Sequence, residues 1–231
     1  MPDEKTTRIV DSRMRLRRRF LERMRNTPSV ADQEPQGSGP VNRHGMPRLP
    51  IGQTETRKWP VLDLGVHPSV STEEWQLTID GAVKNPIRLD WKAMMSLEQV
   101  DDVQDFHCVT TWSRCDLAFS GVRLSSVLAL AEPEDGASHI MCYAYDDYTT
   151  NVSLVEALKD DVLLVHSWDG APLPREHGGP LRMVTPQLYA WKGAKWINRI
   201  EFMTEDRRGY WEQRGYSNTA YPWRDDRYSD D

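Results

Sequence analysis

The stretch with the clearest capacity for chemistry is Asp105-Phe-His-Cys-Val-Thr-Thr-Trp-Ser113, in which Cys108 ends an apolar run and enters a polar loop. This cysteine has four interpretations. It is a buried apolar thiol, a zinc ligand together with His107 and Cys115, a nucleophile with a nearby histidine base, or the single thiolate ligand of a soft metal whose other ligands come from a cofactor. Zinc is disfavoured, because adjacent ligands followed by a six-residue gap match no common zinc spacing. The stretch by itself leaves the other three open.

Two later loops combine basic side chains with glycine, which suits them to bind an anion. In His177-Gly-Gly-Pro-Leu-Arg182, the glycines allow close approach of the backbone to a ligand, and Arg182 offers a planar fork of donors for phosphate. In Trp191-Lys-Gly-Ala-Lys-Trp196, Lys192 and Lys195 flank a Gly-Ala pair with its backbone N–H groups. The first loop favours anion binding as much as a structural turn. The second, taken alone, is more typical of a surface turn with solvated lysines.

A fourth segment, Asp146-Asp-Tyr-Thr-Thr-Asn151, follows an expected strand that ends near Tyr145. Its residue types are typical of a hydrogen-bonded turn. Its chemical interest lies in Tyr148, because a phenol is a hydrogen-bond donor that an active site can use.

Short strands and helices must position these loops. Alternation in Trp75–Asp80 predicts a half-buried strand, Asp90 is placed to cap a helix over Trp91–Leu97, and Ser153 and Glu156 fit a capping box. Apolar runs predict a helix over Leu124–Ala131 and extended segments over Val100–Val109, His139–Tyr145, Val162–Ser167, Leu181–Thr185 and Trp196–Met203. Because strands and helices interleave without regular βαβ spacing, we predict a mixed α+β fold.

The first 56 residues differ in composition from the rest. Residues 8–25 have the pattern of a basic helix with few apolar positions, which we interpret as a solvated or frayed extension, with a membrane-surface or partner-binding helix as the alternative. Residues 26–57 are rich in Pro, Gly, Gln and Ser and are expected to bury too little apolar surface to fold. We therefore predict a basic N-terminal extension and linker over residues 1–56 and one folded domain over residues 57–231.

Composition and charge exclude several classes of protein. With 231 residues, 39% of them apolar, the chain can form one medium domain with a useful core. A net charge of −6 argues against a nucleic-acid binder, although nine basic and four acidic residues give the first 26 residues a positive charge. Three cysteines are too few for a disulfide scaffold.

No apolar run reaches the length of about 18 residues that a membrane span needs. The cluster Arg17-Arg18-Arg19 is followed by charged residues, where an export signal needs an apolar stretch. We therefore expect a cytoplasmic protein without an integral membrane segment.

Taken in order, the Cys108 loop, the Tyr148 turn, the His177–Arg182 loop and the Lys-Gly-Ala-Lys-Trp loop resemble the oxidoreductase molybdopterin-binding domain of sulfite oxidases and periplasmic methionine-sulfoxide reductases. The resemblance covers roughly residues 57–203. It is greatest to stand-alone bacterial sulfite-oxidase-like proteins, whose C-terminal run is similar to residues 205–216 and 222–224 here. It implies a molybdenum-molybdopterin cofactor and two-electron oxygen-atom transfer on a small substrate, either a sulfite-like anion or an S- or N-oxide. A separate electron carrier is implied as well.

The resemblance also implies roles for individual residues. Cys108 matches the thiolate ligand of molybdenum, Tyr148 an active-site tyrosine, and Arg114 lies near the position of a substrate-binding arginine. These three are the expected catalytic residues, with Cys108 as the metal ligand. The expected cofactor-binding residues are Cys108, His107, His177, Arg182, Lys192, Gly193, Ala194 and Lys195.

The sequence departs from the family pattern in places. Ala144 stands where the periplasmic reductases have a cofactor-binding threonine, and His177 replaces one of their asparagines, as in sulfite oxidases. The run after Cys108 lacks the paired arginines of sulfite oxidases, so sulfite itself is not predicted as the substrate. A non-catalytic binding module that keeps the fold is the alternative function, and a zinc or cysteine hydrolase is the third.

Overall fold

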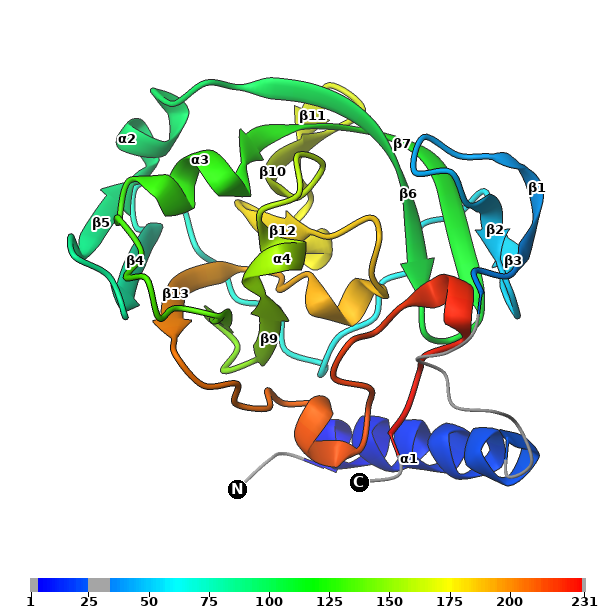
Figure 1. Cartoon of the computed structure of the whole chain (residues 1–231). Helices are drawn as coiled ribbons and strands as arrows, with labels where there is room; N and C mark the ends of the chain where they lie inside the picture. The colour runs from blue at the N-terminus through cyan, green and yellow to red at the C-terminus, as the bar shows by residue number, and fades with distance from the viewer. Residues whose placement is uncertain (1–3, 25–33, 230–231) are drawn as a thin grey trace.

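A computed structural model describes residues 4–24 and 34–229 of the chain. Within these residues, one sheet has five strands, in the order β5 (Ile87–Asp90), β4 (Gln76–Gly81), β13 (Ile197–Met203), β8 (His139–Ala144) and β9 (Thr149–Ser153). β4 and β13 run parallel, with Ile79 opposite Ile200, whereas the other neighbouring pairs are antiparallel. This sheet lies at the left of the molecule in Figure 1.

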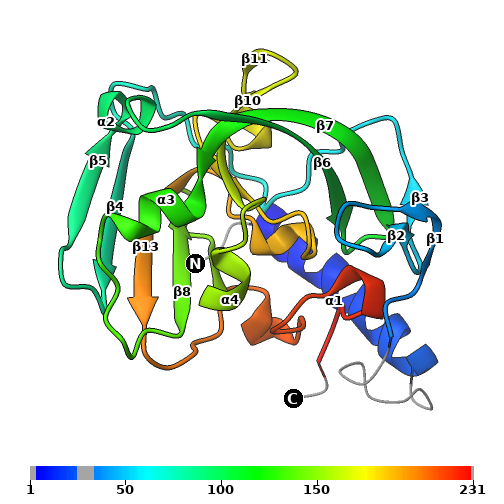
Figure 2. The ribbon, with the colours of Figure 1, turned by 45° about the horizontal axis from the view of Figure 1, so that its top comes forward.

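The other large sheet is built around a long hairpin. β6 (Val100–Cys108) and β7 (Trp112–Arg123) pair antiparallel and arch over the molecule in both views (Figures 1 and 2). β7 also pairs with β3 (Thr54–Glu55) and β10 (Leu163–Trp168), and β10 pairs with β11 (Ala171–Pro172) and β12 (Arg182–Val184). A separate hairpin consists of β1 (Gly37–Val41) and β2 (Pro47–Pro50).

Local sequence signals explain several of these elements. In β4, Leu77 and Ile79 are fully buried while their neighbours are partly exposed, which confirms the predicted half-buried strand. The carboxylate of Asp90 accepts the backbone N–H of Ala93 at 2.7 Å and caps α2 (Trp91–Met95), as predicted. The Ser153 hydroxyl accepts the N–H of Glu156 and caps α4 (Leu154–Ala157).

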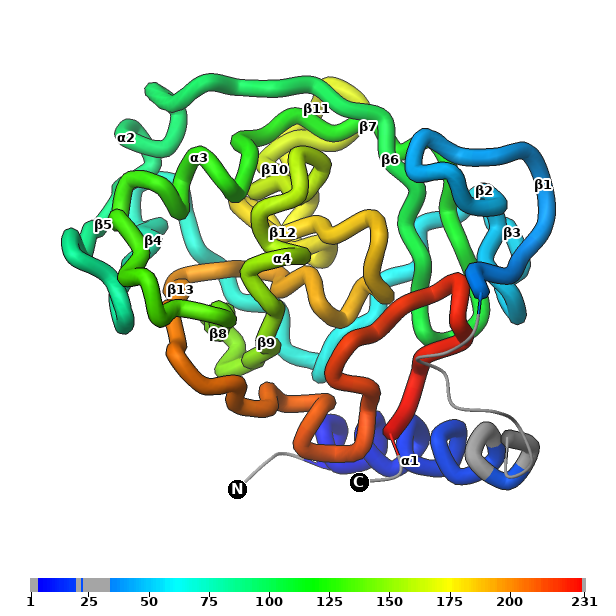
Figure 3. The backbone as a smooth tube through the Cα atoms, viewed as in Figure 1, coloured from blue at the N-terminus to red at the C-terminus, as the bar shows by residue number. Residues whose placement is uncertain are grey.

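The remaining helices are short and connect the strands. α3 (Leu124–Ala129) follows β7 directly, and single turns of 3₁₀-helix occur at η2 (Arg175–His177), η3 (Ala190–Lys192), η4 (Glu212–Arg214) and η5 (Pro222–Arg224). The predicted mixed α+β class is confirmed. The larger apolar core lies on the five-stranded sheet, and a smaller one surrounds Trp59 on the six-stranded sheet. Figure 3 traces residues 57–74, in cyan, across the middle of the molecule from β3 toward β4.

The expectation of a linker over residues 26–57 is wrong for the part that the structure describes. β1, β2 and β3 all lie in this stretch, and β3 adds a parallel strand to β7. The backbone N–H groups of Thr54 and Thr56 donate to the carbonyls of Thr111 and Ser113. Backbone pairing with an edge of a sheet needs few apolar side chains, so the polar composition did not reveal it. Residues 26–33 of the expected linker lie outside the described residues.

The expectation that the basic helix is a solvated extension is also wrong. α1 (Glu4–Met24) lies along the edge of the domain, beside the C-terminal segment (Figures 1 and 2). Val10 and Met14 pack against the larger core, and the Arg17 guanidinium donates to the carbonyls of Gly215 and Ser229 at 2.9 and 2.6 Å. The few apolar positions therefore suffice for docking, because partly buried hydrogen bonds supplement them. Among the described residues, no helix combines the length and apolarity needed to cross a bilayer.

Candidate active site

A cavity lies where segments from distant parts of the chain meet. Its walls come from α1, the stretch after Trp59, the end of β6, the turn before β9, the two glycine-bearing loops and the segment around η4. It encloses about 810 Å³ of space free of atoms, part of it open to solvent. Six residues expected from the sequence line it together: Cys108, Tyr148, His177, Arg182, Gly193 and Lys195.

Cys108 stands at the end of β6, where the chain turns tightly into β7. The turn is closed by a hydrogen bond from the Thr111 N–H to the Cys108 carbonyl at 3.2 Å, and Thr111 has φ of 72°. The Cys108 sulfur contacts the Thr110 hydroxyl at 3.1 Å. Burial raises the pKa of the Cys108 thiol, although the Thr110 hydrogen bond and nearby arginines oppose this. A thiolate at this position therefore needs a strong additional positive charge, which a bound metal ion supplies.

Arg182 is a buried cation whose hydrogen bonds go only to backbone carbonyls. It opens β12, is 2% exposed, and donates to the carbonyls of His177 at 3.0 Å and of Gly193 at 3.4 Å. Its guanidinium lies over the rings of Trp59 and Phe106. In residues 4–24 and 34–229 no carboxylate forms an ion pair with it, and burial lowers its pKa to about 9. A buried, uncompensated guanidinium at a cavity wall fits an anionic ligand.

Lys195 extends this positive region, and His177 lies in the same cavity as an uncharged ring. The His177 ring stacks on Trp59 with centroids 4.0 Å apart, and burial together with the Arg182 and Lys195 charges lowers its pKa to about 4. It is therefore neutral at physiological pH. Lys195 donates to the Glu176 carbonyl at 2.7 Å and lies 3.5 Å from Asp63. Burial and the charge of Arg182 lower its pKa to about 8.

The glycines of the His177 loop have a different use from the one expected. At Gly178, which has φ of +106°, a Cβ would come within 2.9 Å of the Lys195 Cβ, and at Gly179 within 2.2 Å of the Leu173 carbonyl oxygen. Both are needed for the loop to pack on its own neighbours rather than on a ligand. Gly193 lines the cavity, but a Cβ there would likewise meet the Met183 carbonyl oxygen, at 2.5 Å.

Tyr148 and Asp146 occupy the wall beyond the cysteine. The Tyr148 hydroxyl donates to the Trp191 carbonyl at 2.6 Å, and burial raises its pKa well above the usual value. The phenol is therefore a donor at all physiological pH values. Burial also raises the pKa of Asp146 to about 6, partly offset by the hydrogen bond from the Tyr148 N–H. Asp146 was not among the residues singled out for chemistry in the sequence.

Four residues expected at the site do not line the cavity, and three of them are His107, Arg114 and Ala194. The His107 ring is almost fully buried, and its Nδ1 atom bonds to the Ser113 hydroxyl at 2.8 Å. Arg114 donates to the Cys115 carbonyl. The Ala194 methyl is fully buried in the core. Because successive side chains of a strand point to opposite faces, His107 points away from the face that Cys108 occupies. The expectation that both neighbours bind the cofactor did not take this into account.

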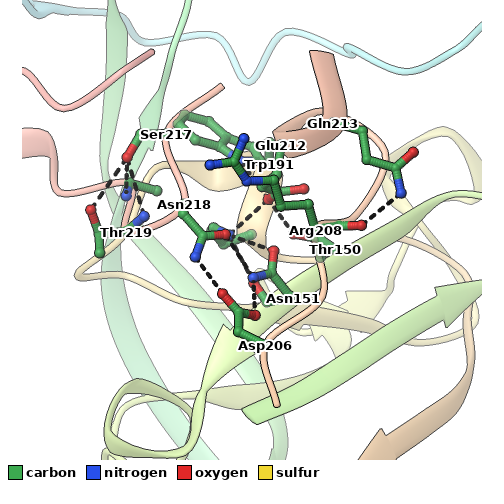
Figure 4. A network of polar contacts seen from close by, with 12 residues as sticks. Thr150, Asn151, Trp191, Asp206, Arg208, Glu212, Gln213, Ser217, Asn218 and Thr219 are labelled. Carbon is green, nitrogen blue, oxygen red and sulfur yellow. Dashed lines mark hydrogen bonds and ion pairs between the residues drawn. The ribbon is translucent and has the colours of Figure 1, made fainter. Parts of the chain in front are cut away.

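Lys192, also expected to bind the cofactor, is instead part of a buried network, and Figure 4 shows its partners Asn151 and Glu212. Its ammonium lies 2.7 Å from the Glu212 carboxylate and donates to the Asn151 carbonyl at 2.8 Å. Glu212 also accepts the Thr150 hydroxyl and the Trp191 indole N–H, at 2.9 and 3.0 Å. The charge of Lys192 is thus neutralised inside the protein and is not offered to a ligand.

The aromatic walls and the helix side of the cavity were not predicted from the sequence. Trp59, Trp191, Trp211 and Tyr216 line it, and so does Arg13 from α1. The concentration of tryptophan in loops was a signal for the aromatic residues, because loop tryptophans that do not extend a core favour a binding surface. No local signal pointed to Arg13.

Metal binding by side chains alone is not supported. In the parts of the chain that are described, no group of three or more His, Cys, Asp or Glu side chains is arranged to hold a metal ion, and all three cysteines are free. The zinc interpretation of His107, Cys108 and Cys115 therefore has no geometric basis. A metal at Cys108 needs most of its ligands from a cofactor.

Comparison with known proteins identifies the family. The family model for the oxidoreductase molybdopterin-binding domain matches residues 64–211. The chain belongs to this family. The uncharacterized oxidoreductase YuiH of Bacillus subtilis is 36% identical to this family member over 79% of its chain and 92% of YuiH. The molybdopterin-binding family member is also 28% identical to the protein-methionine-sulfoxide reductase catalytic subunit MsrP of Gluconobacter oxydans, over 60% of the chain and 50% of MsrP.

The fold of this molybdopterin-binding domain recurs in a solved structure. The sulfane dehydrogenase SoxCD from Paracoccus pantotrophus superimposes with a TM-score of 0.56 at 19% identity, over 60% of this chain and 40% of that one. The chain thus spans only about half of the reductase and less of the dehydrogenase. It is an oxidoreductase-family protein of sulfite-oxidase-like type, in a family whose members generally bind a molybdenum cofactor.

The cavity suits such a cofactor. A pterin phosphate would be held by the buried Arg182 and the partly buried Lys195, one from each glycine-bearing loop, and the stacked rings of Trp59 and His177 provide a flat apolar wall. The Cys108 sulfur faces the same space. The donor set is therefore one thiolate and two cations, which fits an anionic cofactor that brings most of the metal ligands itself.

Proposed function

We propose that this protein is a molybdenum-molybdopterin enzyme that transfers an oxygen atom, in a two-electron reaction, to or from a small substrate. The observation that carries the proposal is one cavity that contains the Cys108 sulfur and the buried Arg182 guanidinium, which has no carboxylate partner in the described residues. A guanidinium kept at such a desolvation cost indicates an anionic ligand. A thiol in the same cavity indicates a metal carried by that ligand.

Different residues of the cavity bind the cofactor and transfer protons. Arg182 and Lys195 bind the anionic part of the cofactor, and Cys108 ligates the metal as a thiolate. When bound, the cofactor supplies the two-electron oxygen-transfer chemistry. The aromatic rings of Trp59, Trp191 and Trp211 keep bulk water from the reacting groups.

Proton transfer falls to Asp146, and Tyr148 acts beside it as a hydrogen-bond donor. With a pKa of about 6, Asp146 takes up or releases a proton near neutral pH inside the cavity. Tyr148 stays protonated and donates a hydrogen bond, to the Trp191 carbonyl in this structure.

A separate electron carrier and a cytoplasmic location belong to the same proposal. Oxygen-atom transfer leaves two electrons to be delivered or removed, so a redox partner is required. The free thiols of Cys108, Cys115 and Cys142 support a reducing compartment.

The test is the metal content of the purified protein and of two cysteine variants. We expect close to one molybdenum atom per chain, little or none in Cys108→Ser, and the full amount in Cys115→Ser, since Cys115 is also buried but does not line the cavity. Wild-type protein free of molybdenum, or equal molybdenum in Cys108→Ser, would refute the proposal. A screen of sulfite, S-oxides and N-oxides with dye electron carriers then identifies the substrate and direction.

A further inference from the structure

α1 is hydrogen-bonded to the domain on two sides of the cavity. Near its start, the Lys5 ammonium and the Thr6 hydroxyl donate to the carbonyls of Gly65 and Leu64, each at 2.9 Å. Further along, Arg17 donates to carbonyls of the C-terminal segment. Residues 6, 10, 13 or 14 and 17 share one helix face, so this face is the one that turns toward the domain. Leu64 and Tyr216, on the two sides, both line the cavity.

Arg13 lies on that docked face, between the two anchor points. Its side chain lines the cavity and is partly buried. Within residues 4–24 and 34–229, no hydrogen bond or ion pair involves its guanidinium, whereas Arg8 on the same helix is paired with Glu4. Cys108 and Tyr216 line the same cavity as Arg13.

The positive charges of the cavity therefore form two groups. Arg182 and Lys195 interact with each other and suit the cofactor phosphate. Arg13 comes from α1 instead and lines the cavity together with Cys108, the proposed metal ligand. Arg227, a cation that contacts the residue after Cys108, already donates to the Val109 carbonyl and pairs with Asp225 at 2.5 Å. The cofactor phosphate explains the first group and leaves Arg13 unexplained.

We infer that Arg13 is a specificity-determining residue that binds a small oxoanion at the Cys108 side of the cavity and makes the enzyme selective for anionic over neutral substrates. This inference rests on the proposed function. A planar guanidinium with free donors matches the oxygens of such an anion. The aromatic residues around it lower the local dielectric and strengthen that attraction. Arg13, on the N-terminal helix, thus takes the substrate-binding role that was expected of Arg114.

The first experiment uses sulfate, an oxoanion that the enzyme cannot oxidise, titrated into molybdenum-loaded protein in a calorimeter. We expect Arg13→Gln to raise the Kd for sulfate at least tenfold. Arg18→Gln is the matched control, because it removes the same charge from an exposed position of the same helix, and it should leave the Kd unchanged. Arg13→Lys, which keeps the charge without the fork, should fall between wild type and Arg13→Gln.

The second readout is the division between KM and kcat. With an anionic substrate such as sulfite, Arg13→Gln should raise KM about tenfold or more with little change in kcat, while KM for a neutral sulfoxide stays the same. Arg13→Met, which retains the apolar stem, should repeat this pattern. Amide exchange of α1 confirms that the helix remains docked in the variants.

Two results separate the failure of this inference from the failure of the proposed function. Wild-type protein without molybdenum refutes the function, whatever the sulfate affinities are. Molybdenum-loaded protein whose sulfate Kd is equal in wild type, Arg13→Gln and Arg13→Met overturns the role of Arg13 and leaves the function standing. Equal losses in Arg13→Gln and Arg18→Gln would also overturn it, because they would show a general effect of helix charge.

Discussion

At the scale of single residues, the site is defined by ionisable groups held in disfavoured states. Arg182 and Lys195 are cations with lowered pKa values, and His177 is kept neutral beside them. The protein carries these costs in the absence of a ligand, since no carboxylate among the described residues neutralises Arg182. An anion that binds between Arg182 and Lys195 relieves the repulsion of the two cations. The low dielectric of the buried site also makes its attraction to them stronger than in water. Ionisable groups with strongly shifted pKa values at a cavity wall therefore indicate a functional site.

His177 gives this argument a pH test. Its folded pKa of about 4 lies below the unfolded value near 6.5, so the unfolded chain binds more protons between these values and folding stability falls as pH decreases through this window. For cofactor-free protein, we expect the stability lost to His177 between pH 7 and pH 5 to be about 2 kcal/mol. His177→Phe keeps the stacking on Trp59 and should lack this loss.

Urea unfolding of both proteins at pH 7 and pH 5 provides the measurement. The difference between wild type and variant isolates His177 from the carboxylates, which titrate in both. A difference that does not change with pH would contradict the lowered pKa.

At the scale of elements, α1 is the part of the fold whose role the sequence least indicated. Its amphipathic character is weak, and its docking depends on side-chain hydrogen bonds to carbonyls at Gly65, Leu64, Gly215 and Ser229. The two partly buried bonds from the charged Arg17 guanidinium contribute about 1.5 kcal/mol each. The helix therefore closes the cavity through polar anchors more than through apolar burial.

Arg17→Ala should loosen this helix without unfolding the domain. We expect amide hydrogens of α1 to exchange at least tenfold faster in the variant, while those of β6 and β7 are unaffected. Arg18→Ala, an exposed neighbour, is the control and should exchange like wild type. Unaltered exchange in Arg17→Ala would mean that the carbonyls of Gly215 and Ser229 do not anchor α1.

At the scale of the whole molecule, the cavity exists because segments far apart in the chain are tied together. Glu212 from the C-terminal segment pairs with Lys192 from the second glycine-bearing loop, both 1% exposed or less. The same carboxylate accepts the Trp191 indole N–H, and Trp191 accepts the Tyr148 hydroxyl. Asp206 and Asn218 bond to Asn151 and extend the network to a second part of the C-terminal segment (Figure 4).

Loss of the buried countercharge should therefore destabilise the whole domain. Glu212→Gln leaves the Lys192 ammonium buried without an ionic partner, and we expect a loss of at least about 3 kcal/mol in the free energy of unfolding. The double variant Glu212→Gln/Lys192→Met should recover much of this loss.

Glu201→Gln is the comparison for that experiment. It breaks the more exposed pair with Arg207 and should cost about 1 kcal/mol or less. Similar losses for Glu212→Gln and Glu201→Gln, measured by urea unfolding, would show that the buried pair does not hold the C-terminal segment.

The sequence by itself determined the chemistry and the local elements. The order of the Cys108, Tyr148, His177–Arg182 and lysine loops predicted the family, and alternation and capping residues predicted β4, α2 and α4. These features depend on side-chain type and on neighbours a few residues away, so local sequence patterns are enough to predict them. The resemblance of these loops to the family also placed Cys108, Arg182 and Lys195 among the expected site residues.

Only the tertiary structure decided which charges face the cavity. Lys192 and Lys195 flank the same two residues, yet one is neutralised by Glu212 and the other lines the cavity. Arg13 reaches the cavity and Arg114 does not, because α1 folds back across the domain while Arg114 bonds within its own strand. Long-range contacts follow from packing over the whole chain, and no local pattern encodes them. The path of the backbone, rather than residue type, therefore selects which cations meet a ligand.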